Sequence, residues 1–512
     1  MELSRERRML VTTGILMGML LAAMESMIVT TAMPSVVASL GGLVKYSWVF
    51  SLYLLTSTVS MPIWGKLSDL YGRRLCYQLG VLIFIIGSAL CGVSQSMTQL
   101  IIFRALQGLG AGAVVPLGLT IIGEVFTIEE RVRMQGLFSS VWGFASITGP
   151  LIGGFITDHF SWRWIFYINI PFGLLAVIIM WIGLAGPAQR QSRPAIDVAG
   201  AVSLSAAISL LILSCLRGKE GLSLPLSIIA LCGSILCIWI FIRVEQRAAE
   251  PILPLELFRE RIFFVGMLAN LLTGCTIFGS IPFITLYAQG VLGTSATKAG
   301  TILMPLMLGW VCCSVLGGRL LIRIEYRIVT LAGTLLLVLG LIIMTVATNG
   351  TDRQQIYIGD ALMGMGMGLT AISLLIAVQK NMRNQLGVAT AATLFFRNIG
   401  GVVGAAIMGT IVSTSLSHII ATIPTTDSAV SVDLARMATD INIAFDPIAR
   451  TALHPQALSY FRGALAGGIH NAFFFALIVG LGALASVWKV PPGRAIEKPA
   501  AEPSLNRSQA AN

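Results

Sequence analysis

The sequence has few charged residues, which make up only 11% of its 512 positions. A soluble domain carries about 25% charged residues. Hydrophobic residues reach 56%, and the mean hydropathy is +0.85. Because a large part of any globular surface must face water, a soluble protein of this size could not hide so many apolar side chains. The composition therefore excludes a soluble protein and predicts an all-α polytopic membrane protein.

Signals for metal, nucleotide or nucleic-acid binding are also lacking. The eight cysteines lie in or beside apolar stretches, which argues against a disulfide framework, and the four histidines show no ligand spacing. The Gly-rich segment 108–112 has no preceding strand and no following Lys-Ser/Thr pair, so an ATP-driven pump is not expected. The net charge of +11 comes from short basic clusters between apolar runs. We expect no metal, no cofactor, no nucleic-acid partner and no enzymatic activity.

Fourteen apolar runs are long enough to be candidate membrane-spanning helices. Basic residues are concentrated in the connecting segments on the side of the amino terminus, and the positive-inside rule then places both termini in the cytoplasm. The runs lie near 10–32, 47–66, 75–94, 98–122, 133–157, 164–185, 196–216, 222–242, 262–288, 297–318, 327–348, 355–378, 387–414 and 468–488.

The segment 65–74, Gly-Lys-Leu-Ser-Asp-Leu-Tyr-Gly-Arg-Arg, is expected to be a short charged loop between the second and third runs. Gly65 and Gly72 allow a tight turn and a close approach of helix ends. Asp69 can accept from backbone N–H groups at the amino end of a neighbouring helix, where the dipole favours an anion. Arg73 and Arg74 can reach carboxylates or lipid phosphates. A plain positive-inside anchor would explain the arginines but not the Asp and both glycines.

This Gly-x-Leu-x-Asp-x-x-Gly-Arg-Arg pattern after a second spanning helix resembles the signature of the major facilitator superfamily of secondary transporters. The resemblance implies two six-helix bundles related by an internal repeat, with this loop in the cytoplasm steadying one of two alternating conformations. The segment 318–322 weakly repeats the pattern without the Asp. With fourteen runs, the helices near 196–216 and 222–242 form an inserted pair, which resembles the drug:proton antiporter branch of the superfamily.

The same resemblance gives the expected domain organisation. Residues 1–190 form an N-terminal six-helix bundle, and residues 191–250 contain two linker transmembrane helices. Residues 251–490 form a C-terminal six-helix bundle with a long outer loop at about 415–467. Residues 491–512 are expected to form a disordered cytoplasmic tail.

Glu25 lies inside the first apolar run, where an ionised carboxylate costs roughly 2.5 kcal/mol or more. Such a group faces a cavity or a partner, and it can hold a proton in one state and a cation in another. Alternatively, it forms a fixed ion pair that only orients helices. Fourteen-helix drug exporters have a carboxylate, usually Asp, in an equivalent stretch before an Ile-Val pair, so the resemblance implies proton coupling and substrate binding by Glu25.

Arg104 is the second charge placed deep in a span, and Gln107-Gly108 follows it as in the fourth-helix motif of the family. A guanidinium beside a buried carboxyl favours its charged form and can sense its protonation. Alternatively, Arg104 bonds to backbone carbonyls across a helix gap. We expect Arg104 to take part in proton coupling, but the sequence does not say whether it touches Glu25.

The segment 149–154, Gly-Pro-Leu-Ile-Gly-Gly, lies in the fifth run. Gly149 and Gly153 share one helix face and allow close helix packing, and Pro150 bends the helix. Together with Gly154, the pattern resembles the motif of the superfamily's antiporters, which favours export over uptake.

Other polar and aromatic residues of the spans are candidates for substrate binding. Asp360 is expected about one turn inside the outer end of its helix, where it could instead be a rim charge. Arg397 and Asn398 are expected in mid-span and resemble the family's thirteenth helix. Some exporters of divalent cations have further acids in the second, tenth or thirteenth helix, and these spans contain none here, which favours monovalent or neutral substrates. The full set of candidates is Glu25, Tyr53, Gln107, Trp142, Asn270, Asp360, Arg397 and Asn398.

The sequence thus predicts a proton-coupled antiporter of the inner (cytoplasmic) membrane that exports lipophilic, cationic or neutral drugs and toxic compounds by alternating access. Its expected partners are a small lipophilic substrate, protons and membrane lipids, and it is expected to be a monomer. Two alternatives stay open. One is a dedicated exporter of an endogenous siderophore, antibiotic or lipid on the same fold, and the other is a membrane sensor without transport.

Overall fold

The computed structural model describes residues 4–40, 46–184, 197–215, 224–294, 301–347, 353–422, 428–439 and 453–495. Within these ranges the chain is helical throughout, apart from turns and one isolated β-bridge between Glu325 and Arg494. The all-α fold predicted from composition is therefore confirmed.

The first helices coincide with the first six predicted runs, and the sixth run is divided into two helices. These helices, called here the N-terminal group, are α1 (Arg5–Leu40), α2 (Tyr46–Tyr71), α3 (Arg73–Val93), α4 (Met97–Val125), α5 (Ile128–His159), α6 (Trp164–Tyr167) and α7 (Asn169–Gly183). The next two, called the inserted pair, are α8 (Val198–Cys215) and α9 (Leu224–Glu245).

The remaining helices, called here the C-terminal group, coincide with the last six predicted runs and add three short elements. They are η2 (Leu255–Arg259), α10 (Arg261–Gly290), α12 (Met304–Leu321), α13 (Tyr326–Ala347), α14 (Arg353–Asn381), η3 (Arg383–Gln385), α15 (Leu386–Thr422), α16 (Ser428–Thr439) and α18 (Pro455–Trp488). By length and composition, 11 helices in the described residues can cross a membrane. The total of fourteen spans stays a prediction.

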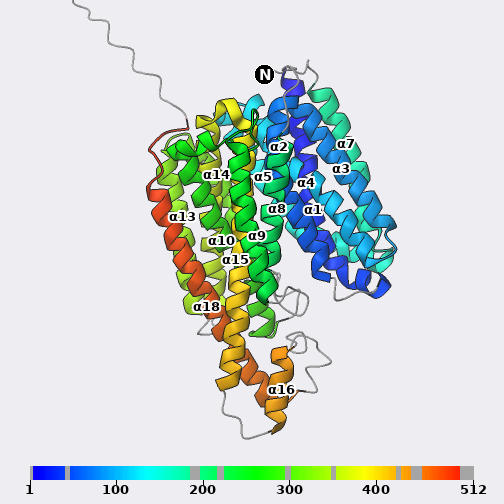
Figure 1. Cartoon of the computed structure of the whole chain (residues 1–512), viewed down its shortest axis with the longest axis vertical. Helices are drawn as coiled ribbons and strands as arrows, with labels where there is room; N and C mark the ends of the chain where they lie inside the picture. Colours follow the sequence, from blue (N-terminus) through cyan, green and yellow to red (C-terminus); the bar gives the residue numbers. More distant parts are fainter. Residues whose placement is uncertain are drawn as a thin grey trace, which may run out of the picture.

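The two groups lie side by side and meet along two seams. Inside the N-terminal group, α1 packs against α4, α5 and α7, while α2 and α3 pack against α4. Inside the C-terminal group, α14 packs against α12 and α13, and α10 packs against α15 and α18. One seam is formed by α2 and α15, and the other by α5 and α12. α8 of the inserted pair touches both α2 and α15, and Figure 1 shows the pair between the two groups.

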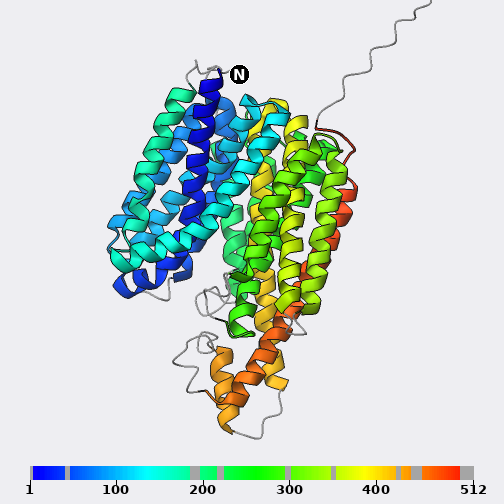
Figure 2. The ribbon, with the colours of Figure 1, turned by 180° about the vertical axis from the view of Figure 1, so that it is seen from behind.

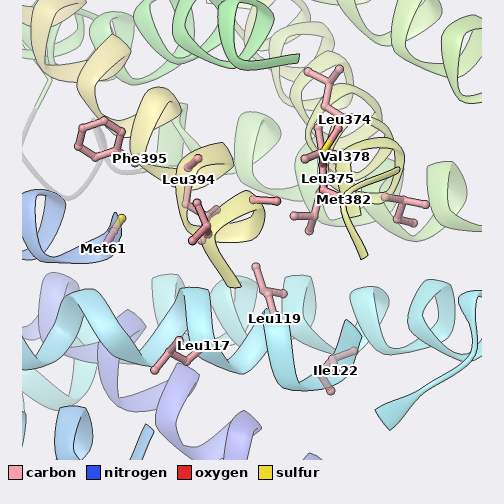
Figure 3. Packing of buried hydrophobic residues seen from close by; sticks show 14 of the residues in the cluster. Met61, Leu117, Leu119, Ile122, Leu374, Leu375, Val378, Met382, Leu394 and Phe395 are labelled. Carbon is pink, nitrogen blue, oxygen red and sulfur yellow. The ribbon is translucent and has the colours of Figure 1, made fainter. Parts of the chain in front are cut away.

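Apolar side chains fill the region where α4 meets α14 and α15. Figure 3 shows Leu119 and Ile122 of α4 across from Leu375 of α14 and Leu394 of α15. All four are buried and belong to one hydrophobic cluster that crosses from one group to the other. Moving such a side chain from water into a protein interior stabilises the folded state by about 1.5–3 kcal/mol. The groups are thus held together at this level by packing as well as by polar contacts.

The segment 415–467, predicted as a long outer loop, contains helices in its described residues. α15 continues to Thr422, α18 begins at Pro455, and α16 lies between them, as Figure 2 shows below the other helices. Leu434 of α16 and Phe461 of α18 are buried in one cluster. Hydropathy detects only the apolar part of a helix, so the polar end of a helix that extends beyond the apolar run is predicted as a loop.

The start of the predicted disordered tail is packed against the C-terminal group. The carbonyl of Gly493 accepts from the Tyr326 N–H at 2.9 Å, and Lys380 donates to the carbonyl of Arg494 at 2.7 Å. Residues 491–495 are therefore attached to α13 and α14. Residues 496–512 lie outside the described part of the chain.

Candidate functional site

Glu25 and Arg104 form an ion pair in the interior of the N-terminal group. Arg104 Nη1 on α4 donates to Glu25 Oε1 on α1, and each side chain is only 1% exposed. The other carboxylate oxygen, Oε2, accepts from the amide of Asn169 at the start of α7. Both oxygens of the buried carboxylate therefore have donors, as a charge in a low-dielectric interior requires.

A closed polar network surrounds this pair. Arg104 Nη1 also donates to Gln107 Oε1 at 2.7 Å, and Gln107 Nε2 donates to Ser88 Oγ on α3 at 3.1 Å. Asn169 Nδ2 donates to the same Ser88 oxygen at 2.9 Å. Four helices thus contribute to one network, called here the Glu25 network, whose five side chains are all fully buried.

Close contact between α3 and α4 brings the members of the network together. A Cβ atom added at Gly87 would lie 2.5 Å from the backbone nitrogen of Gln107. Only a glycine allows two backbones to approach so closely. The adjacent Ser88 is thereby placed within hydrogen-bonding distance of Gln107.

The other side of Arg104 faces α2. Its Cζ atom lies 4.0 Å from the centroid of the Tyr53 ring, and its Nε donates to the Val49 carbonyl at 3.4 Å. A guanidinium over an aromatic face is stabilised by the ring quadrupole. Arg104 therefore also has contacts on α2, apart from its pair with the carboxylate.

The segment 65–74 is almost entirely helical rather than a loop. α2 continues to Tyr71, α3 begins at Arg73, and only Gly72 lies between them with φ of +93°. An added Cβ at this glycine would meet nothing within 4 Å, so the backbone conformation and not space requires glycine here. The prediction of a tight turn was correct, but its extent was overestimated.

Asp69 binds the amino end of α15 across the first seam. Its Oδ1 accepts from the Gly387 N–H at 3.1 Å and its Oδ2 from the Val388 N–H at 3.0 Å. The carboxylate thus satisfies free helix-terminal donors and the positive end of the helix dipole. Arg73 pairs with Asp69, and its Nε donates to Glu124 Oε1 at 2.9 Å. These residues are called here the α2–α15 latch.

Two further contacts lie beside the latch. An added Cβ at Gly65 would be 2.7 Å from the Ala391 Cβ, so α2 and α15 pack closely there. Lys66 Nζ pairs at 2.7 Å with Glu250 Oε2, in the segment that follows the inserted pair. Arg74 Cζ lies 5.7 Å from the centroid of the Trp181 ring of α7, and Nη1 donates to the Leu184 carbonyl at 3.4 Å. Its contact with a lipid phosphate stays a prediction.

The glycine motif of α5 faces α1 close to the Glu25 network. An added Cβ at Gly149 would lie 2.6 Å from the Cβ of Met27, two residues after Glu25. Gly153 is buried, whereas an added Cβ at Gly154 would meet nothing within 4 Å. The side chain of Pro150 lies outside the described part of the structure. Gly149 is therefore the motif residue that brings α5 onto α1.

The remaining substrate candidates lie outside the Glu25 network. Trp142 is exposed on α5, and Asn270 is buried on α10, where its amide donates to the Gly266 carbonyl of the same helix at 2.9 Å. Asn398 donates to the Met61 sulfur across the first seam at 3.6 Å. Arg397 is half-buried beside it.

Asp360 is not a rim charge. It lies two turns inside α14, its side chain is 0% exposed, and neither carboxylate oxygen has a hydrogen-bond partner in the described residues. Its helix packs closely on α13 at this level, because an added Cβ at Gly359 would meet Met344 of α13 at 2.9 Å. The position of an acidic residue along its helix does not show whether other helices pack over its side chain, so the burial of Asp360 could not be read from the sequence.

Two members of the Glu25 network were absent from the sequence candidates. Asn169 is the polar residue of an otherwise apolar sixth run, which is a signal that hydropathy alone passes over. Ser88 gives no such signal, because serine side chains in helices commonly bond to their own backbone.

Comparisons with known proteins agree on one family. A family model described as Major Facilitator Superfamily matches residues 15–405. Multidrug transporter protein MdtP of Bacillus subtilis is 39% identical over 425 residues, which cover 81% of this chain and 77% of the relative. Multidrug resistance protein 3 of the same organism is 37% identical over 404 residues, which cover 78% of this chain and 79% of the relative.

A solved structure supports the fold. The crystal structure of the human organic anion transporter MFSD10 aligns with a TM-score of 0.55, covering 93% of this chain and 99% of that chain. The sequences are 15% identical, so this likeness shows the fold alone. The predictions of a major facilitator fold and of a multi-pass membrane protein are confirmed.

Proposed function

This chain belongs to the Major Facilitator Superfamily, and we propose that it exports lipophilic cationic or neutral compounds in exchange for protons. The names of its two relatives in Bacillus subtilis, a multidrug transporter and a multidrug resistance protein, support this proposal. In this proposal the chain is a monomer of the cytoplasmic membrane with both termini inside. Residues 1–190 and 251–490 act as two moving bundles.

The observation that carries the proposal is the buried Glu25–Arg104 pair. A proton that arrives from outside neutralises the carboxylate, and Arg104 then keeps only its contacts with Gln107, Tyr53 and the Val49 carbonyl. A cationic substrate that arrives from inside favours the ionised carboxylate and expels the proton. The two ligands thus compete for one carboxyl, which is the requirement for exchange.

The α2–α15 latch supports alternating access. In the proposed orientation it lies on the cytoplasmic side, so that the structure represents a state closed toward the cytoplasm. Opening this side requires Asp69 to release two backbone N–H groups, each worth about 1.5–3 kcal/mol as a hydrogen bond to a charged group. The latch therefore favours the closed side until binding energy at the site offsets this loss.

Contacts through α5 connect the proton site to the second seam. Gly149 of α5 packs on α1 beside Glu25, and an added Cβ at Gly143 would lie 3.3 Å from Val311 of α12. A movement of α1 on protonation is thereby passed to the C-terminal group through one rigid helix. We propose this packing as the reason for the glycine motif in α5.

The test is proton release from the purified full-length protein. Adding the cationic dye ethidium to weakly buffered, detergent-solubilised protein should release protons, and Glu25→Gln should abolish the release. Glu256→Gln, which changes an exposed carboxylate in η2, is the matched control and should leave the release unchanged.

Transport by the same variants in proteoliposomes completes the test. The wild type should accumulate ethidium against its gradient when a pH gradient is imposed, and Glu25→Gln should not. Uphill transport by Glu25→Gln would overturn the assignment of the proton site. Absence of dye movement by the wild type would favour a sensor, and transport restricted to one endogenous metabolite would favour a dedicated exporter.

A further inference from the structure

A further charge inside a span, Arg397, lies in the C-terminal group. α15 begins at Leu386, so at 1.5 Å per residue Arg397 lies roughly 16 Å along the helix from its start. The apolar core of a bilayer is about 30 Å thick, so a helix that enters it near Leu386 carries this guanidinium deep inside it. A charge at this depth is expensive and marks a functional site by default.

Arg397 has no counter-charge among the described residues. Its Nε is buried and has no hydrogen-bond partner in these residues, and its guanidinium lies against the Phe278 ring of α10, whose centroid is 6.0 Å from Cζ. Glu25 is already paired with Arg104. The C-terminal group thus presents an uncompensated positive charge, whereas the N-terminal group presents a neutral pair.

The other buried acid of this group lies too far away to neutralise Arg397. Asp360 is 21 residues from Asn381 at the end of α14, which corresponds to roughly 31 Å at 1.5 Å per residue. α15 begins directly after the short helix η3 that follows α14. The two side chains are therefore separated by roughly 15 Å along the helix axes.

Arg397 is held beside two aromatic rings. An added Cβ at Gly274 of α10 would lie 2.8 Å from the Arg397 carbonyl carbon, so the two helix backbones are in contact there. Phe278, one turn further along α10, makes an edge-to-face contact with Trp310 of α12, with ring centroids 5.8 Å apart. All three side chains are half-buried, so part of each stays accessible.

The residues that follow Arg397 and Trp310 in the sequence lie at the two seams. Asn398, next to Arg397, contacts Met61 of α2 at the first seam. Trp310 lies next to Val311, which faces Gly143 of α5 at the second seam. Arg397 and Trp310 are therefore carried by the two helices, α15 and α12, that meet the N-terminal group.

We propose that Arg397, Phe278 and Trp310 bind the carboxylate and the aromatic body of a lipophilic substrate that is anionic or zwitterionic. The planar guanidinium matches a carboxylate and the rings match an aromatic body. A lipid headgroup stays at the membrane surface and does not reach this depth. The inference rests on the proposed export function and extends its substrates beyond cationic and neutral compounds.

The test compares rhodamine B, which carries a free carboxylate, with its ethyl ester, which does not. Transport of each dye is measured in proteoliposomes that contain the full chain. Arg397→Gln should raise the half-saturating concentration of rhodamine B roughly tenfold or more, as expected for a lost hydrogen bond between charged groups. The value for the ester should not change, and Arg397→Lys should restore part of the affinity for the acid.

Arg323→Gln is the matched control, because this arginine is exposed in the turn between α12 and α13. It should transport both dyes like the wild type. An equal loss of acid and ester transport in Arg397→Gln would assign Arg397 a structural role and overturn the proposal, as would unchanged affinity for the acid. If the wild type transports neither dye, the proposed export function is refuted. Binding at this site is then tested without transport, by the quenching of tryptophan fluorescence by the two dyes in detergent.

Discussion

Replacing Asp69 by Asn should open the α2–α15 latch. The carboxylate accepts from the N–H groups of Gly387 and Val388 and pairs with Arg73. The first N–H groups of a helix have no acceptor inside that helix, so the protection of these two amides against exchange depends on Asp69. Asn keeps one acceptor oxygen and loses the charge, so at least one of the two bonds is lost.

The expected magnitude follows from the geometry. The Asp69 side chain is 15% exposed, so the bonds are largely shielded from water. A hydrogen bond to a charged group is worth about 1.5–3 kcal/mol, which corresponds to roughly a 10- to 150-fold change in an equilibrium. Asp69→Asn should therefore accelerate hydrogen exchange at the amino end of α15 by a factor in this range.

Hydrogen–deuterium exchange of the full-length protein, read by mass spectrometry on peptides that begin at Leu386, measures the effect. Glu256→Gln should leave these peptides unchanged, since this carboxylate lies on the surface of η2. If Asp69→Asn leaves exchange at the start of α15 at the wild-type rate, the carboxylate does not hold the two groups together and the latch has no role in closing this side.

Three further predictions concern the stability of the solubilised protein, measured by its melting temperature. Arg104→Ala leaves Glu25 without its counter-charge and should destabilise the protein by about 3–5 kcal/mol, whereas an unchanged melting temperature would mean that the pair contributes nothing. Gly149→Ala should lower stability by about 1–3 kcal/mol through overpacking, while Gly154→Ala, which has free space, should not, and equal effects would refute this packing argument. Asp360→Asn should not lower the melting temperature, because the carboxylate has no partner to lose in the described residues, and a fall of several degrees would reveal one.

The helices were predictable because each apolar run is a direct consequence of the bilayer. The errors occurred where the bilayer no longer determines the structure. Charges and glycines in the segment 65–74 suggest a loop, yet α2 continues through them because its backbone bonds do not depend on side-chain polarity. The same reason explains why α15 and α18 extend into the predicted outer loop.

The site was predictable only as a set of residue types. Glu25, Arg104 and Gln107 were candidates because charged or amide side chains are rare inside apolar runs. Glu25 and Arg104 lie on helices that are not adjacent in sequence, so their contact depends on packing. Asn169 joins the network from α7 for the same reason.

The charged residues inside the spans differ in whether a residue of opposite charge lies beside them. This cannot be read from their neighbours in the sequence. Glu25, Arg104 and Arg397 are alike in the sequence, each an ionisable residue within an apolar run. In the structure Glu25 and Arg104 pair with each other, whereas Arg397 lies against the ring of Phe278. A carboxylate in an ion pair can take up a proton while Arg104 keeps its other contacts, whereas an uncompensated charge gains most from a ligand of opposite sign. If each group keeps its own task, proton exchange and carboxylate recognition are separable, and Arg397→Gln should leave the proton release induced by ethidium intact.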